Sequence, residues 1–222
     1  KTWGLGQDPD LYLWKDGRLS LTARLDGCLG SMVMGDCGNA GGQSLACDGD
    51  SLLLIMQARY RAQMVKLDEN GTRTVLPFDG NLVSVTCQKS VCLALGAEKD
   101  GFLEVYQRTE NGFVRRSHAS DDFVRQHSIA QVCKLQVTDS TGKAMDGFLL
   151  LPPDFDADRR YPAILEIHGG PRATYSDGFQ HEMQVMAASG YIVMYCNPHG
   201  SAGYGEAYAD LRGKYGTIDY QD

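Results

Sequence analysis

The sequence predicts a partial β-propeller followed by an incomplete α/β layer with a mixed, mostly parallel sheet. Two observations support this prediction. Hairpin signals recur about every 40 residues up to residue 115, and after residue 130 the pattern changes to strand, helix, strand. A polar stretch over residues 118–130 separates the two patterns. We therefore predict two domains, residues 1–122 with about two blades and an outer hairpin, and residues 123–222.

The first hairpin type is marked by an Asx-Gly pair between two short apolar runs. Asn and Gly tolerate the positive φ that tight hairpins require, so each pair predicts a turn. The three hairpins predicted in this way span residues 11–21, 64–76 and 103–114.

A second hairpin type alternates with the first, over residues 44–56 and 82–95. Together the two types give four strands every ~40 to 45 residues, which is the spacing of a propeller blade. A general antiparallel sandwich is the alternative that this spacing leaves open. The Gly-rich residues 26–42 are expected to form a long exposed loop.

In the second part, residues 132–138 and 145–151 predict a strand pair. Residues 163–167 predict a strand covered on both faces, because their apolar run is almost continuous. Helical spacing over residues 179–190, then a buried strand over 191–195, completes a βαβ unit. A final amphipathic helix is expected over residues 206–215.

Composition excludes several classes of protein. The chain has 222 residues, of which 43% are hydrophobic and 22% charged, which is typical of a globular protein and not of a disordered one. No apolar run reaches the ~18 residues of a membrane span. The net charge of −7 argues against nucleic acid or an anionic membrane as a partner.

The seven cysteines include no C-x-x-C pair, so the sequence predicts no zinc site. Several cysteines lie within apolar runs, where a thiol packs as a small hydrophobic group. We expect reduced, structural cysteines and therefore a cytoplasmic protein.

Two glycine-rich motifs follow the two predicted strands of the βαβ unit. The first is His168-Gly169-Gly170-Pro171, and the second runs from Asn197 to Gly205. Glycines in a strand-to-helix loop leave backbone N–H groups uncovered, as in half of an oxyanion hole. A plain glycine-rich turn is the alternative for the first motif.

Residues 161–171 and 188–206, which contain these motifs in order, resemble the start of the catalytic domain in the prolyl oligopeptidase family, most closely the acylaminoacyl-peptidase and dipeptidyl-peptidase branch. The resemblance implies an α/β-hydrolase domain beside a propeller, and attack by a serine on short peptides through an acyl-enzyme, with no cofactor. It points to the N–H of Gly170 as an oxyanion donor, with Gly169 as the alternative.

The chain departs from the family pattern at His199, where the family usually has Arg. It also contains no G-x-S-x-G motif, so Ser201 is expected to be a loop residue and not the nucleophile. We predict that the triad lies beyond residue 222. The chain, which opens on Lys1, is then a fragment that is inactive alone and partners the rest of the same polypeptide. His118, His127 and His181 are expected at the surface.

Two other functions remain open. The chain could belong to a hydrolase of another ester or amide, since α/β-hydrolase layers support many reactions. It could instead belong to a propeller-based binding protein with a degenerate hydrolase half. The choice between acyl-amino-acid and dipeptide release, and a homo-oligomeric state, are also left open.

Overall fold

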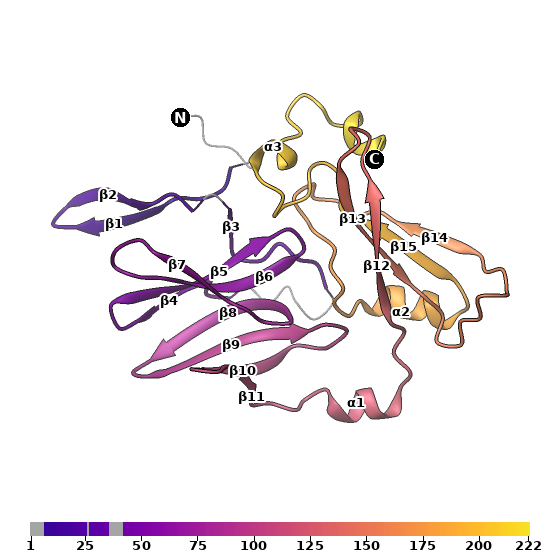
Figure 1. The fold of residues 1–222 in the computed structure, drawn as a ribbon, viewed down its shortest axis with the longest axis horizontal. Coiled ribbons are helices and arrows are strands. Elements are labelled where there is room, and N and C mark those ends of the chain that lie inside the picture. The colour runs from indigo at the N-terminus through magenta and orange to yellow at the C-terminus, as the bar shows by residue number, and fades with distance from the viewer. Residues whose placement is uncertain (1–6, 26, 36–41) are drawn as a thin grey trace.

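The computed structural model describes residues 7–25, 27–35 and 42–222. Its first element is a hairpin of β1 (Leu11–Lys15) and β2 (Arg18–Ala23), which projects away from the other sheets (Figure 1). Asp16 and Gly17 form the turn with φ values of 51° and 73°, as the Asx-Gly signal predicts.

Two antiparallel sheets follow, each built mainly from strands consecutive in the chain (Figure 1). The predicted hairpins over residues 44–56, 64–76, 82–95 and 103–114 are confirmed by the strand pairing. The first sheet contains β3 (Cys28–Leu29), β4 (Leu45–Asp48), β5 (Ser51–Ala58), β6 (Arg61–Leu67) and β7 (Arg73–Leu76). The second contains β8 (Gly80–Gln88), β9 (Val91–Glu98), β10 (Glu104–Thr109) and β11 (Gly112–Arg115).

The two sheets share an apolar core that includes Leu53, Met64, Leu82 and Tyr106. At the end of the β8–β9 hairpin, Cys87 and Cys92 lie directly opposite each other and form a disulfide. The expectation that all cysteines are reduced is therefore wrong for this pair, because hairpin register places the two thiols side by side. The described free cysteines are Cys28, Cys47, Cys133 and Cys196, while Cys37 lies outside the described residues.

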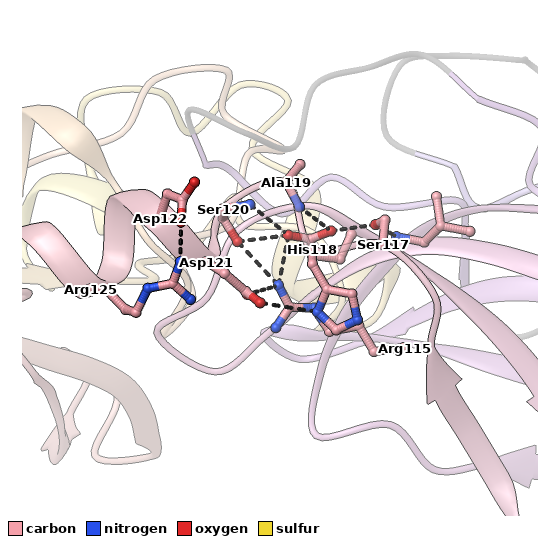
Figure 2. Close-up of polar contacts among 10 residues, drawn as sticks. Arg115, Ser117, His118, Ala119, Ser120, Asp121, Asp122 and Arg125 are labelled. Carbon is pink, nitrogen blue, oxygen red and sulfur yellow. Dashed lines mark hydrogen bonds and ion pairs between the residues drawn. The ribbon is translucent and has the colours of Figure 1, made fainter.

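A short helix, α1 (Asp121–Gln126), connects β11 to the second part of the chain. The buried carboxylate of Glu104 accepts hydrogen bonds from Arg115 and from the backbone and side chain of Ser120, all just before or at the start of this helix (Figure 2). The polar connection between the two parts is therefore ordered by one buried acid.

The second part forms a four-stranded mixed sheet in the order β12-β13-β15-β14. Its strands are β12 (Val132–Thr138), β13 (Ala144–Leu150), β14 (Ala163–Glu166) and β15 (Ile192–Cys196). Only β14 and β15 pair in parallel, and the other two pairs are antiparallel. The prediction of a mostly parallel sheet is wrong for the described residues. Each parallel pair of strands needs a crossover connection, and the described residues of this sheet contain one such connection, through α2 (His181–Ala188).

The predicted βαβ unit is confirmed: β14, α2 (His181–Ala188) and β15 follow one another, and the two strands are parallel. Helix α2 packs Met183 and Ala187 into a core with Phe148, Val193 and Tyr195 of the sheet. The opposite face of the sheet carries an open cleft of about 610 Å³ lined by Leu165, Ile167 and Met194.

Three other predictions need correction. Strand β14 is not covered on both faces, since Leu165 is 60% exposed at the edge of the sheet. The expected helix over residues 206–215 is limited to α3 (Glu206–Ala209), with a 3₁₀ turn, η1, at Ile218–Tyr220. Residues 28–34 of the expected exposed loop are partly buried, because Val33 forms a β-bridge with Thr174 of the second part; residues 26 and 36–41 lie outside the described residues.

Within the described ranges, no helix is long and apolar enough to cross a membrane.

Candidate functional site

The two glycine-rich motifs lie at the same edge of the mixed sheet. Residues 168–171 follow β14 and residues 197–205 follow β15, and these neighbouring strands run in parallel. The carboxyl ends of parallel strands are where open α/β sheets bind their ligands. A 3.0 Å hydrogen bond between His168 Nε2 and Ser201 Oγ joins the two loops. The structure thus brings together the motifs that the sequence predicts as a site.

Gly170 has a backbone conformation that only glycine adopts without strain, with φ at +127°. A Cβ atom there would lie 2.9 Å from the backbone nitrogen of Ala173. Gly169 has no neighbour within 4 Å of the same position. Of the two glycines, Gly170 is therefore the one whose missing side chain shapes the loop.

Ser201 is fully buried, and its hydroxyl lies 2.7 Å from the carbonyl oxygen of Pro198. Its neighbour His168 is also buried, and burial lowers the pKa of this imidazole against hydrogen bonds that would raise it. A neutral His168 suits a bridge between loops, because an imidazole without charge loses little on leaving water. The burial agrees with the expectation that Ser201 is a loop residue.

Asn197 fastens the second loop to Tyr175, in the segment that follows the first loop. Its side-chain oxygen accepts the N–H of Tyr175 at 2.7 Å, and its amide nitrogen donates to the carbonyl oxygen of Tyr175 at 2.9 Å. The same nitrogen donates to the hydroxyl of Tyr204. Asn197 is fully buried, so water cannot replace these bonds, and they fix the separation of the loops.

His199, which stands where the family usually has Arg, faces two acids. Its Nδ1 lies 2.7 Å from the carboxylate of Asp222, and its Nε2 lies 3.9 Å from that of Asp139. Burial would raise the pKa of Asp222, but hydrogen bonds from the backbone and side chains of His199 and Ser140 outweigh it and lower the pKa. His199 thus hydrogen-bonds to Asp222 and lies beside Asp139 without a hydrogen bond to it.

The second loop also rests on Asp146, a buried acid of β13. Tyr204 donates its hydroxyl proton to Asp146 at 2.7 Å, and Arg59 from the β5–β6 turn donates to the same oxygen at 2.8 Å. No motif in the sequence indicates this contact, because Arg59 and Asp146 lie far apart in the chain. Only the fold brings them together.

Other candidate groups have no part in this arrangement. His118, His127 and His181 are exposed, as predicted, and His118 contacts Asp121 at 3.0 Å. In the part of the chain that the structure describes, no group of three or more His, Cys, Asp or Glu side chains is placed to bind a metal ion.

The sequence comparisons match parts of this chain to peptidases. Residues 177–222 match the model of the prolyl oligopeptidase family. The uncharacterized peptidase YuxL of Bacillus subtilis is 44% identical over 105 residues, which cover 47% of this chain and 16% of that protein. Dipeptidyl-peptidase 5 of Porphyromonas gingivalis is 40% identical over 84 residues, which cover 36% of this chain and 12% of that protein.

Solved structures show the same fold over nearly the whole chain. The acylaminoacyl peptidase of Pyrococcus horikoshii superposes with a TM-score of 0.80 at 19% identity, covering 98% of this chain and 33% of that one. A puromycin-hydrolyzing peptidase of Mycobacterium tuberculosis superposes with a TM-score of 0.67 at 16% identity, covering 98% of this chain and 35% of that one. The chain therefore spans about a third of these structures, and less of the curated relatives.

Proposed function

We propose that the chain belongs to the prolyl oligopeptidase family, whose model matches residues 177–222, and that it is part of a serine peptidase that hydrolyses short peptides. The observation that carries the proposal is the meeting of the loops over residues 168–171 and 197–205 at the carboxyl ends of two parallel strands. Relatives named as a peptidase and a dipeptidyl-peptidase, both more than a third identical, support the reaction class.

In this proposal the two antiparallel sheets of the first part are consecutive blades of a β-propeller, and the mixed sheet is the beginning of an α/β-hydrolase domain. Their four consecutive strands and their superposition on an acylaminoacyl peptidase support this assignment. The boundary between the two domains lies between residues 122 and 123.

The proposed partners are a short peptide and the rest of the same polypeptide. The compartment is the cytoplasm, supported by the four free cysteines among the described residues and opposed by the Cys87–Cys92 disulfide.

The proposed reaction begins with attack of a serine on the substrate carbonyl, with proton transfer to a histidine and formation of an acyl-enzyme. This chain contributes the backbone N–H of Gly170, with Gly169 as the alternative donor, to stabilise the negative oxygen. The positive φ of Gly170 and the crowded position that a Cβ atom would take there favour Gly170, since both mark it as the glycine that the loop conformation requires. The triad lies outside this chain, which is therefore inactive alone.

The proposal is tested by assaying this chain, and a longer protein that contains it, with acyl-amino-acid and dipeptide chromogenic substrates. The longer protein should hydrolyse at least one of them and be inactivated by a phosphonate that labels serine, while this chain should hydrolyse neither. Puromycin serves as a different amide, and turnover of puromycin alone would favour the alternative hydrolase.

The role of Gly170 is tested by a structure of the longer protein with a bound phosphonate. Its oxyanion oxygen should lie within about 3.5 Å of the Gly170 nitrogen. A longer distance, or a shorter one to Gly169, would reject the assignment.

A further inference from the structure

One side chain of the first part touches the second candidate loop and the segment that follows the first. Gln57, near the end of β5, donates from its amide nitrogen to Thr174 Oγ1 at 3.0 Å and to the carbonyl oxygen of Ala202 at 3.2 Å. Thr174 lies four residues after Gly170, and Ala202 lies in the middle of the second loop. Gln57 therefore links the second loop to the segment that follows the first loop, and it does so from the opposite half of the molecule.

The remaining bonds of Gln57 fix its own position. Its nitrogen also lies 2.9 Å from the carbonyl oxygen of Arg59, so its two hydrogens are shared among three acceptors, and its oxygen accepts the N–H of Met32 at 2.8 Å. Met32 in turn accepts the N–H of Thr174 through its carbonyl oxygen at 3.1 Å. The side chain is thus held by the β5–β6 turn and by the segment that pairs with Thr174.

The backbone strengthens the same contact. The N–H of Arg59 donates to the carbonyl oxygen of Gly203 at 2.6 Å. A Cβ at Gly203 would lie 2.3 Å from the carbonyl oxygen of Arg59, so the turn approaches the loop as closely as a glycine allows. We call Gln57, Arg59, Thr174, Ala202 and Gly203 the joint.

Burial makes the joint costly to break. Gln57 is 3% exposed, and Thr174 and Ala202 are fully buried. Water cannot replace a lost donor there, so the carbonyl oxygen of Arg59 would lose its Gln57 donor without compensation, and that of Ala202 would keep only the hydroxyl of Thr174.

We propose that Gln57 is a positioning residue. From the first half of the molecule, it fixes the position of the loop of Gly170 relative to the loop over residues 197–205. It touches no reacting atom. Its effect on hydrolysis passes through Thr174 to the loop that carries Gly170, and this part of the proposal rests on the proposed function.

The first test measures hydrogen exchange of this chain as Gln57→Leu, with Gln63→Leu as the matched control. Gln63 lies in the neighbouring strand β6 and also makes hydrogen bonds through both side-chain atoms, but its partners Ala62, Phe78 and Gly80 all lie in the first half. Amides over residues 172–176 and 200–205 should exchange about tenfold faster or more in Gln57→Leu. They should be unchanged in Gln63→Leu.

A second variant guards against failure of Gln57→Leu to fold. Thr174→Val keeps the shape of the side chain but removes the hydroxyl that accepts from Gln57 and donates to Ala202 at 2.9 Å. It leaves β5 intact and should also speed exchange over residues 200–205. Equal protection of these amides in both variants and the wild-type chain would overturn the positioning role, as would equal loosening in Gln63→Leu.

The last test uses the longer protein and a substrate that it hydrolyses. Gln57→Leu should lower kcat by about ten- to a hundredfold with a smaller change in KM. A displaced oxyanion donor reduces the stabilisation of the transition state more than it reduces substrate binding. Gln63→Leu should retain wild-type kcat. If the longer protein hydrolyses nothing, the proposed function fails while the exchange result stands. If Gln57→Leu loosens the loops but keeps wild-type kcat, the positioning role in catalysis is wrong.

Discussion

At the scale of single residues, the candidate site depends on glycines that are not interchangeable. Gly170 and Gly169 are adjacent in the sequence, and the motif alone leaves either as the donor. The two glycines differ in conformation, since Gly170 has φ at +127° and a crowded Cβ position, whereas the Cβ position of Gly169 is open. Sequence alone predicts the loop but not which glycine shapes it, because backbone dihedrals depend on the contacts of the folded loop.

Gly170→Ala should destabilise this chain by about 1–3 kcal/mol, because the new side chain must adopt a φ region nearly reserved for glycine. Gly169→Ala, the matched control, should change the free energy of unfolding by less than about 0.5 kcal/mol. Urea denaturation of both variants measures the difference. Equal losses in the two variants would contradict the prediction that only the Gly170 conformation requires glycine.

Asp222→Asn should alter the pH dependence of stability. Because the folded pKa of Asp222 lies below its ordinary value, the charged form stabilises the fold above about pH 4, and this contribution is lost as the pH falls through the folded pKa. The variant should be less stable than the wild type near neutral pH, and the gap should close in acid. Unfolding measured from about pH 2 to pH 7 tests this.

The control is Asp154→Asn, which changes an exposed carboxylate in the loop after β13. Its stability should follow the wild type at every pH. A gap between Asp222→Asn and the wild type that stays constant into acid would contradict the prediction.

At the scale of elements, the sequence predicts hairpins well and exposure poorly. The Asx-Gly turns are local signals, and the strands around them form as predicted. The exposure of β14 cannot be predicted from the sequence of the strand alone, since it depends on which strands and helices lie against it. The disulfide between Cys87 and Cys92 was likewise missed, although their equal distance from the turn over residues 89–90 is a signal that register could have supplied.

The connection through α1 depends on Glu104, which accepts hydrogen bonds from Arg115, Ser117 and Ser120. Burial would raise the pKa of this carboxyl, but hydrogen bonds from Ser117, Ser120 and Arg115 outweigh it and hold the pKa well below its usual range. Glu104→Ala should therefore destabilise the chain by about 3 kcal/mol, because Arg115 and Ser120 lose a buried acceptor.

Thermal or urea unfolding checks this value, with Glu110→Ala as the control. Glu110 is exposed at the β10–β11 turn and should have an effect below about 0.5 kcal/mol. Hydrogen exchange over residues 115–126 should quicken in Glu104→Ala alone. A stable variant with unchanged exchange would mean that α1 is ordered by other contacts.

At the scale of the whole molecule, apolar surface is exposed at two separate places. On the β1–β2 hairpin, Trp14 is 67% exposed and Leu19 is 62% exposed. At the far edge of the mixed sheet, Leu165 and Ile167 of β14 and the following loop are 60% and 72% exposed. An unpaired edge strand with apolar side chains favours association with other chains.

The isolated 222-residue chain should therefore associate as its concentration rises, measured by sedimentation velocity. The double substitution Leu165→Lys and Ile167→Lys should reduce this association, since charge on an edge strand opposes pairing. Lysines in place of Val185 and Glu182 on the exposed side of α2 provide a control with added charge away from the edge. A chain that stays monomeric at all concentrations would contradict the expectation.

The joint has a consequence for recombining related proteins. In a hybrid that takes residues 1–122 from one relative and the remainder from another, Gln57 and Arg59 come from a different parent than the residues that they contact. Such a hybrid should lose hydrolysis where the relative that supplies the first part lacks a glutamine at the position of Gln57, even though the two parts are joined in a surface connection. Grafting the β5–β6 turn together with the second part should restore it, so the unit of exchange is not the continuous domain but that domain plus one distant hairpin.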